Sequence, residues 1–188
     1  MSSPAAGNSV RRGATIFFTG LPGAGKTTLA RALEAQLTGP LQRTVTMLDG
    51  DSVRRYLTGE LGFSREHRDL NVLRIGYVAT QIVRHAGIAV CAAIAPYAQT
   101  RRQVRSMIAP HGVFIEVYVS TPLETCEARD PKGLYAQARA GLIEHFTGVS
   151  DPYEAPQQPE IAIDTRSCAP EEAARRVLDR LAAEGCLR

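Results

Sequence analysis

Residues 14–27 read ATIFFTGLPGAGKT, a short apolar, β-prone run followed by the phosphate-loop pattern G-x-x-x-x-G-K-[ST]. In this pattern, glycines let successive backbone N–H groups turn inward around a polyphosphate. Lys26 supplies a mobile cation, and Thr27 offers a hydroxyl group to Mg²⁺. A Gly-rich turn can match the pattern by chance, but the preceding strand and the following helix favour a nucleotide site. The stretch therefore predicts an enzyme that uses a nucleoside triphosphate.

A helix is expected directly after this loop, over residues 27–37. Leu29, Leu33 and Leu37 recur at i, i+4 and i+8, a spacing typical of one apolar helix stripe. The positive end of the helix dipole then lies at the loop, where it favours a bound anion.

The rest of the chain alternates β-like runs with helix-like ones. A polar helix is expected over residues 64–85, and a last helix from Pro170 with Val177, Leu178 and Leu181 on one face. The expected strands cover residues 14–19, 44–48, 88–94, 113–119 and 160–164. This alternation predicts a three-layer α/β fold of the P-loop kinase type, in which helices flank a central parallel sheet. Ligands of such sheets gather at the carboxyl ends of the strands.

The composition suits one compact domain of 188 residues, of which 44% are hydrophobic. We expect a flexible tail over residues 1–12 and a single domain over residues 13–188. Residues 130–159 are rich in Gly, Pro and charge, lack a clear strand and are too long for an ordinary connection. This segment is predicted to be a mobile lid over the nucleotide, with a floppy surface insertion as the alternative.

Charge and cysteine content favour a cytoplasmic enzyme with no nucleic-acid or membrane partner. The net charge of +3 is small and its residues are scattered, so no long basic groove is indicated. The four cysteines lack C-x-x-C spacing, which favours reduced thiols over a disulfide frame or a zinc site. The apolar run over residues 86–98 is too short to span a bilayer, and residues 1–12 lack the apolar stretch of an export signal.

Two aspartates follow the second expected strand. Asp49 and Asp51 lie two positions apart, so both side chains can face the cleft, one organising Mg²⁺ and water and the other accepting a proton from an attacking hydroxyl. The alternative is a simple Asp-Gly turn in which the first aspartate caps the next helix.

Several arginines follow the aspartates. Planar guanidinium groups suit bidentate recognition of a phosphate or sulfate on an acceptor, whereas any one of these arginines taken alone is better explained as part of a solvated helix face. The candidates are Arg54, Arg55, Arg68, Arg74, Arg101 and Arg102.

Seven segments lie in one collinear series within residues 13–164. They read GLPGAGKTT, LDGDSVR, LGFSREHRDLNVLRIGYVA, IAPY, CEARDPKGLYAQARAG, FTG and PYEAP. Together they closely resemble the adenylylsulfate kinase family. The resemblance implies a homodimeric P-loop kinase that uses ATP and Mg²⁺ to phosphorylate the ribose 3′-hydroxyl of adenosine 5′-phosphosulfate (APS). The implied products are 3′-phosphoadenosine 5′-phosphosulfate and ADP, in sulfate assimilation.

The resemblance implies which residues of this chain take part in catalysis and in ATP binding. Asp51 matches the general base, Asp49 its partner near the metal, and Lys26 the loop lysine; Mg²⁺ is assigned to Thr27 and Asp49. Arg129 resembles the arginine that covers the ATP adenine. The full set implied to bind ATP is Gly20, Pro22, Gly23, Ala24, Gly25, Lys26, Thr27, Thr28, Arg129 and Thr165.

The resemblance also implies an acceptor site. Arg54, Arg68 and Asn71 match positions that hold the phosphosulfate and adenosine. The acceptor adenine stacks between Phe63 and Phe146, a role that flat apolar rings suit. The full set implied to bind the acceptor is Asp51, Arg54, Phe63, Arg68, Asn71, Ile94, Pro96, Tyr97, Lys132, Gly133, Leu134 and Phe146.

Two departures from the family pattern bear on mechanism. Ala95 stands where some members carry a phosphorylated serine, so direct in-line transfer from ATP is the simpler mechanism. Near Lys132, which matches a lysine reaching into the site from the lid, Ala136 and Gln137 replace a common Lys-Lys pair. Their neutrality weakens the attraction of the lid to a polyphosphate, while activity is expected to survive.

Two other functions share the phosphate loop. One is a kinase for another small hydroxylated acceptor, which acceptor selectivity would reveal. The other is a regulatory nucleotide-binding module without turnover, which would bind ATP without forming ADP. The sequence leaves open whether the chain works beside a separate sulfate adenylyltransferase.

Overall fold

A five-stranded parallel sheet forms the centre of the computed structural model, which describes residues 12–187. The strand order is β2-β3-β1-β4-β5. The strands are β1 (Ala14–Gly20), β2 (Val45–Asp49), β3 (Ile88–Ala92), β4 (Val113–Val119) and β5 (Ile161–Ile163). All five strands were expected from the sequence, with bounds that differ by no more than two residues.

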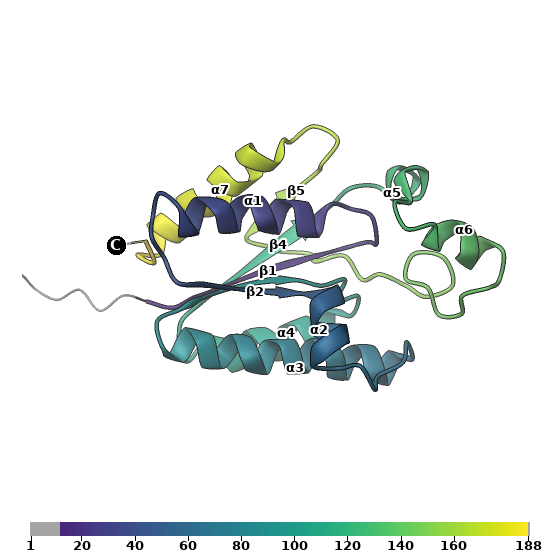
Figure 1. Cartoon of the computed structure of the whole chain (residues 1–188), viewed down its shortest axis with the longest axis horizontal. Coiled ribbons are helices and arrows are strands. Elements are labelled where there is room, and N and C mark those ends of the chain that lie inside the picture. Colours follow the sequence, from purple (N-terminus) through teal and green to yellow (C-terminus); the bar gives the residue numbers. More distant parts are fainter. Residues whose placement is uncertain (1–11, 188) are drawn as a thin grey trace, which may run out of the picture.

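Two layers of helices cover the sheet (Figure 1). Helices α1 (Lys26–Thr38) and α7 (Pro170–Ala183) lie on one face, and α3 (Arg65–Arg84) and α4 (Ala98–Ile108) lie on the other. The three-layer α/β fold predicted from the sequence is therefore confirmed.

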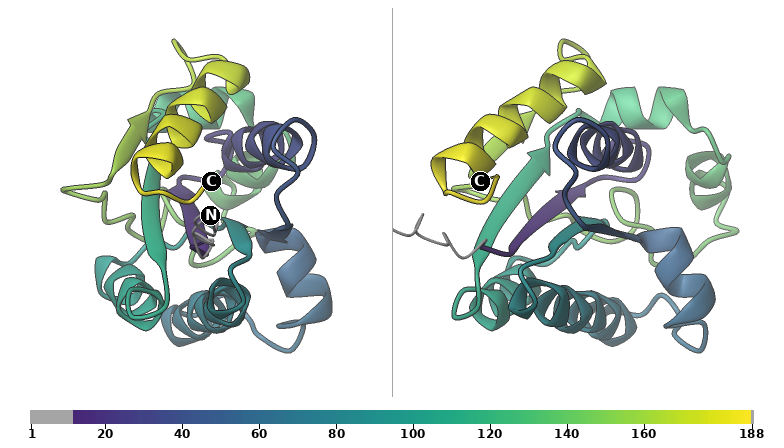
Figure 2. Two further views of the ribbon diagram at one scale, coloured as in Figure 1. Left: turned by 90° about the vertical axis from the view of Figure 1, so that its left-hand side faces the viewer. Right: turned by 60° about the vertical axis from the view of Figure 1, so that its left-hand side comes forward.

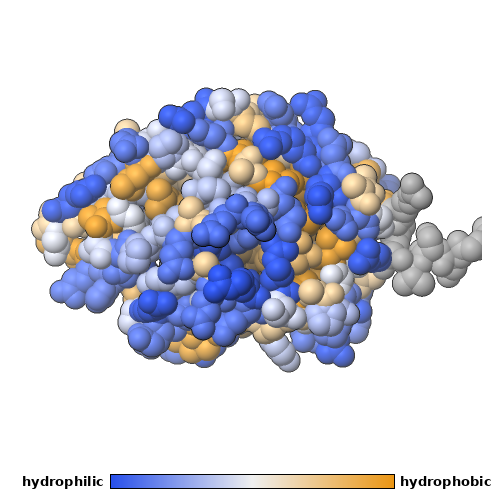
Figure 3. Space-filling model, turned by 180° about the vertical axis from the view of Figure 1, so that it is seen from behind, coloured by the Kyte–Doolittle hydropathy of each residue, from blue (hydrophilic) through white to orange (hydrophobic). Residues whose placement is uncertain are grey.

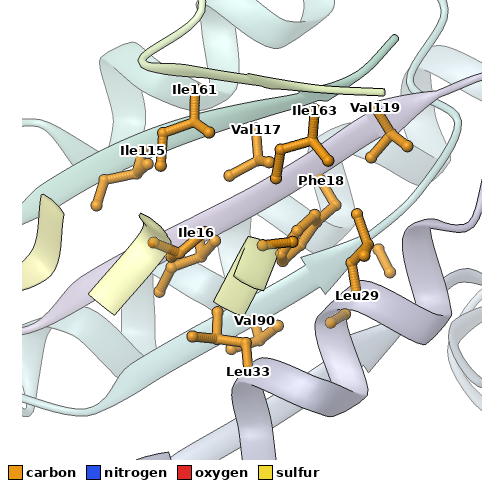
Figure 4. Close-up of a cluster of buried hydrophobic side chains, with 14 of the residues drawn as sticks. Ile16, Phe18, Leu29, Leu33, Val90, Ile115, Val117, Val119, Ile161 and Ile163 are labelled. Carbon is orange, nitrogen blue, oxygen red and sulfur yellow. The ribbon is translucent and has the colours of Figure 1, made fainter. Parts of the chain in front are cut away.

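Strand β1 divides the core into two clusters because its successive side chains point to opposite faces. Ile16 and Phe18 pack toward α1 and α7, and Figure 4 shows them with Leu29 and Leu33 of α1. Phe17 belongs to the cluster on the α3 and α4 side. Every residue of β1 is buried, as expected for a strand covered on both faces.

The predicted helices have the expected buried faces. Leu29, Leu33 and Leu37 of α1 are all buried. In α7, Val177 and Leu181 are buried, whereas Leu178 is only partly buried. Helix α3 begins where the side chain of Ser64 accepts a hydrogen bond from the backbone N–H of His67, which is an N-cap of the expected kind.

Four helices were not specified from the sequence. Three are short: α2 (Gly50–Tyr56), α5 (Leu123–Arg129) and α6 (Leu134–Arg139). A helix of two turns contains too few residues to show a clear apolar period. The fourth, α4, is polar over most of its length. Figure 3 shows that one whole face of the molecule is mostly hydrophilic, with apolar residues scattered among the polar ones.

Helices α2, α5 and α6 lie at the carboxyl end of the sheet (Figures 1 and 2). The lid segment, residues 130–159, contains α6 and an isolated bridge between Thr147 and Asp151, but it contributes no strand to the sheet. Its mobility stays a prediction. The predicted tail lies outside the described residues apart from Arg12, which donates to the carbonyl of Glu184 at 3.3 Å.

Candidate active site

The phosphate loop, residues 20–27, joins β1 to α1 in a backbone conformation that needs glycine. Gly23 and Gly25 have φ angles of +73° and +105°, which L side chains rarely adopt. A Cβ at Gly23 would lie 3.1 Å from the carbonyl oxygen of Cys126, and one at Gly25 would lie 3.2 Å from Cγ2 of Thr165. Both positions are thus restricted by conformation and by close packing.

The Lys26 ammonium group is buried inside the phosphate loop. Its Nζ donates to the carbonyl oxygens of Gly20 at 2.9 Å and Leu21 at 2.8 Å. Burial lowers the pKa of Lys26 to about 8, while the nearby carboxylates of Asp49 and Asp51 act in the opposite direction. The loop therefore holds a cation whose charge is poorly solvated, a setting that favours an incoming anion.

The side chain of Asp49 points to the phosphate loop. Its Oδ1 accepts a hydrogen bond from the hydroxyl of Thr27 at 2.8 Å. Asp49 occupies the N-cap position of α2 but makes no side-chain cap bond, so the interpretation of this residue as a helix cap is wrong. A hydroxyl and a carboxylate suit Mg²⁺, which takes few protein ligands beside water and phosphate oxygens, so the pair fits this ion.

Asp51 belongs to a different element from Asp49. The helix α2 begins at Gly50, so strand spacing does not set the direction of Asp51 as the sequence argument assumed. Its carboxylate forms an ion pair with Lys132 of the lid segment, and its side chain is 75% exposed. Both carboxylates nevertheless lie near enough to Lys26 to influence its pKa.

Arg54 and Phe63 form one part of the predicted acceptor site. The Arg54 guanidinium lies 4.4 Å from the centre of the Phe63 ring, and its Nη1 donates to the carbonyl of Gly62 at 3.2 Å. Burial and the nearby charge of Arg68 lower the pKa of Arg54. Phe63 itself is 59% exposed, and a large exposed ring beside Arg54 is available to a planar, anionic ligand.

Arg68 connects α3 to the lid segment. Its Nη1 donates to Thr147 Oγ1 at 2.7 Å and lies 3.2 Å from Oδ2 of Asp151. Asn71, one turn further along α3, is buried and accepts a hydrogen bond from the hydroxyl of Thr58 at 2.7 Å. The structure brings Arg68 to the same region as Arg54, and Arg68 and Asn71 are both buried and already have partners within the protein.

Three of the residues implied to bind the acceptor, Ile94, Pro96 and Tyr97, form its predicted wall, and two of them accept hydrogen bonds through their backbone carbonyls. The carbonyl of Ile94 accepts from the hydroxyl of Thr19 at 2.7 Å, and that of Pro96 accepts from the N–H of Glu154 at 2.8 Å. The ring of Tyr97 lies under the guanidinium of Arg65, 4.4 Å from it.

The remaining predicted acceptor residues lie in the lid segment. Gly133 has a φ angle of +66° and precedes α6, and Leu134 is the first residue of that helix. Phe146 is buried, and its ring packs edge-on against Tyr135 with centroids 5.0 Å apart. Phe63 and Phe146 thus have different ring neighbours, and the proposed stacking of an adenine between them stays a prediction.

Arg129 and Thr165 lie behind the phosphate loop. Arg129 Nη1 donates to Thr165 Oγ1 at 2.7 Å, and that hydroxyl donates to the carbonyl of Ala24 at 3.1 Å. Sequence reasoning missed a third member, Thr121, whose hydroxyl is 2.8 Å from that of Thr165 and 3.1 Å from the Ala24 carbonyl. Its position just after a parallel strand, β4, is the signal that identifies it.

Of the other candidate arginines, Arg101 is occupied elsewhere. Its Nε donates to Glu116 at 2.9 Å, and its Nη1 donates to the carbonyl of Ala95 at 2.7 Å. Ala95 has a φ angle of +44°, so this contact supports an unusual backbone conformation beside the acceptor wall. Arg74 forms a surface ion pair with Glu60.

Arg55 and Arg102 are less engaged. Arg55 lies over the ring of Tyr56 at 5.6 Å, and Arg102 is exposed on α4. Among the six arginines, Arg54 and Arg68 are the two with neighbours from the predicted acceptor site.

Within residues 12–187, no group of three or more His, Cys, Asp or Glu side chains is arranged to hold a metal ion. No helix in that part of the chain has both the length and the apolar character needed to cross a membrane.

Comparison with known proteins gives matches over nearly the whole chain. The model of the adenylylsulphate kinase family matches residues 12–164. An adenylyl-sulfate kinase of Synechococcus sp. (strain JA-3-3Ab) is 52% identical over 177 residues, which cover 94% of this chain and 98% of that protein.

Solved structures agree with the sequence matches. The Mycobacterium tuberculosis APS kinase CysC in complex with AMPPNP and APS is 42% identical, with a TM-score of 0.86 over 92% of this chain and 99% of that chain. A hexameric APS kinase from Thiobacillus denitrificans is 49% identical, with a TM-score of 0.73 over 95% of this chain and 30% of that chain. The resemblance drawn from the seven sequence segments is confirmed, and the chain belongs to the adenylylsulfate kinase family.

Proposed function

We propose that this kinase transfers the γ-phosphoryl group of ATP directly to the ribose 3′-hydroxyl of APS. The observation that carries the proposal is the meeting of the phosphate loop with Asp51 and the lid lysine, Lys132, at the carboxyl end of the sheet. This arrangement puts a polyphosphate cradle, a candidate base and a mobile cation within one region. Ala95 cannot carry a phosphate, so transfer without a phosphoserine intermediate is the mechanism.

The ATP site is formed by the phosphate loop and the residues behind it. Backbone N–H groups of the loop bind the phosphates, and the buried charge of Lys26 stabilises the negative charge of the transferring group. Arg129 and Thr165 hold the adenine side, where their mutual hydrogen bond already joins them to the carbonyl of Ala24. When bound, Mg²⁺ supplies positive charge that neutralises phosphate oxygens, and Thr27 and Asp49 would hold it.

The acceptor lies between α2, α3 and the lid segment. Arg54 and Arg68 bind its phosphosulfate group, and the adenine binds between the rings of Phe63 and Phe146. Asp51 accepts the proton of the 3′-hydroxyl as that oxygen attacks the γ-phosphorus. Lys132 contacts Asp51 before substrates enter, and we expect it to turn to the anionic substrates when they bind.

The family resemblance also suggests an oligomeric state, a cellular location and a partner enzyme. We expect a cytoplasmic homodimer that supplies sulfate assimilation and that operates with a sulfate adenylyltransferase as the source of APS. The similar kinase from T. denitrificans is hexameric, so the number of subunits requires its own measurement, by light scattering on the purified protein.

The experiment that tests the function measures ADP release from ATP and Mg²⁺ with and without APS. Mass and the position of the new phosphate identify the nucleotide product. ADP that depends on APS, with a matching 3′-phosphorylated product, supports the proposal. Turnover only with other acceptors would assign a different substrate, and tight binding of both nucleotides without turnover would indicate a regulatory module.

A further inference from the structure

Tyr135 is a buried residue of the lid segment that touches the phosphate loop. Its side chain is only 2% exposed, and its hydroxyl donates a hydrogen bond to the carbonyl oxygen of Pro22 at 3.0 Å. Burial raises the pKa of this hydroxyl, so the group keeps its proton and remains a donor at neutral pH. Pro22 lies between the two phosphate-loop residues Gly20 and Gly23, where nucleotide phosphates are expected to bind.

The ring of the same residue touches the acceptor side of the lid segment. Tyr135 and Phe146 meet edge to face, with ring centroids 5.0 Å apart and planes at 78°. The backbone around Phe146 is itself fixed, because its N–H donates to Ser150 Oγ at 2.8 Å and its carbonyl accepts from the N–H of Asp151 at 3.0 Å. A movement of Tyr135 therefore has to move Phe146 or break their contact.

Close packing at Gly148 reinforces this connection. A Cβ at this glycine would lie 3.0 Å from Cδ2 of Leu21 in the phosphate loop and 3.9 Å from the hydroxyl oxygen of Tyr135. At the start of α6, the carboxylate of Asp130 accepts hydrogen bonds from the backbone N–H groups of Tyr135 and Ala136, at 3.1 and 3.0 Å. The start of α6 is thus tied down, and the Tyr135 side chain has little freedom to move independently of the lid segment.

We propose that Tyr135 is a positioning residue that couples the two substrate sites, because its hydroxyl binds the phosphate loop and its ring supports Phe146. A nucleotide that orders the phosphate loop holds the carbonyl of Pro22 in place. The hydrogen bond from Tyr135 to this carbonyl then holds the Tyr135 side chain, and the Tyr135 ring in turn holds the ring of Phe146. Coupling of this kind is reciprocal, so APS must strengthen the binding of the nucleotide by the same factor. The inference rests on the proposed function, since it takes Phe146 to be part of the APS site.

The test compares the dissociation constant of AMPPNP with and without saturating APS, by titration calorimetry on the full chain. The coupling factor is the dissociation constant without APS divided by the dissociation constant with APS. We expect it to exceed one in the unchanged protein. Tyr135→Phe keeps the ring and removes the hydroxyl, so it should lower the coupling factor about two- to tenfold, the range of one lost hydrogen bond. Affinity for AMPPNP alone should change less.

Tyr153→Phe is the matched control. Tyr153 also lies in the lid segment, is partly buried, and bonds through its hydroxyl to Thr19 at 2.9 Å, but its ring stacks on Tyr118 rather than on Phe146. This variant loses one part-buried hydroxyl contact as well, so a similar fall in melting temperature is expected, with an unchanged coupling factor. A purely structural role of Tyr135 would make the two variants behave alike.

Further outcomes separate this inference from the proposed function. If the unchanged protein turns over APS but its coupling factor is one, or Tyr135→Phe leaves the factor unchanged, the inference is wrong and the function stands. If the unchanged protein neither binds nor turns over APS, the proposed function fails and the inference fails with it. A double-mutant cycle adds a second readout: Phe146→Leu should reduce coupling less in the Tyr135→Phe background than alone.

Discussion

The phosphate loop and the lid segment meet at one end of the sheet, yet they are held there by contacts of different range. Lys26 bonds to the carbonyls of Gly20 and Leu21, within six residues of itself. Lys132 of the lid segment pairs with Asp51 across 81 positions of sequence, and Arg68 reaches Thr147 across 79. Local contacts therefore place the Lys26 ammonium group in the phosphate loop, whereas Lys132 and Arg68 reach these partners only when distant segments are packed together.

The largest expected effect concerns Asp51, the α2 residue that pairs with Lys132 of the lid segment. Asp51→Asn removes the proposed base while keeping the size of the side chain, so kcat should fall about 10²-fold or more. Binding of AMPPNP should stay nearly intact, because the phosphate loop does not depend on this carboxylate. Steady-state kinetics and calorimetry check both expectations, with the exposed α7 variant Asp179→Asn as the control. Full activity of Asp51→Asn would remove the residue from the mechanism.

The second prediction tests whether Arg68 binds APS or only holds the lid segment in place. Arg68→Ala loses a charged hydrogen bond to APS, so the KM for APS should rise about 10- to 150-fold, while the KM for ATP changes little. The exposed residue Arg102, changed to Ala, is the control. A fall in kcat with an unchanged KM for APS would instead mean that Arg68 only holds Thr147 and Asp151 of the lid segment in place.

The third prediction concerns pH and the donor side. The pKa of Lys26 is lowered to about 8, so the free protein loses this charge as the pH rises through that value, and affinity for AMPPNP should fall by up to about tenfold per pH unit above it. Calorimetry across this range checks the slope. Lys26→Arg keeps its charge throughout and should show a flatter profile. A flat profile in the unchanged protein would mean that Lys26 keeps its charge to higher pH.

The same pKa fixes the sign of a stability effect. The unfolded chain binds the Lys26 proton up to the ordinary value of 10.5, whereas the folded chain releases it near 8. Between these values the unfolded state holds more protons, so this group makes the free energy of unfolding rise with pH. Chemical denaturation of the Lys26→Met variant, which has no charge to bury, should lack this contribution.

The smallest effect is expected behind the phosphate loop. Thr121→Val removes a hydroxyl that lies 3.1 Å from the carbonyl of Ala24, so the KM for ATP should rise about two- to tenfold. Thr80→Val is the matched control, because the hydroxyl of Thr80 donates at 2.8 Å to the carbonyl of Gly76 within α3, far along the chain from the loop. Equal effects of the two variants on the KM for ATP would show that Thr121 has no special link to the loop.

Where prediction from the sequence failed, the missing information was spatial. The direction of Asp51 was argued from strand spacing, but the backbone turns into α2 at Gly50. Arg101 was a candidate for anion binding, but the fold buries it against Glu116. The sequence did not show the roles of Tyr135 and Thr121, because each acts through a contact with a backbone carbonyl that lies far away in sequence.

The sequence by itself determined the parallel sheet, the phosphate loop and the family, because apolar periodicity, glycine conformation and motif spacing are properties of neighbouring residues. The tertiary structure alone decided that Asp49 bonds to Thr27 instead of capping α2, and that Lys132 pairs with Asp51. It alone showed Tyr135 between the phosphate loop and Phe146. The physical reason is that a side chain's partner depends on the path of the whole chain, which no local pattern encodes.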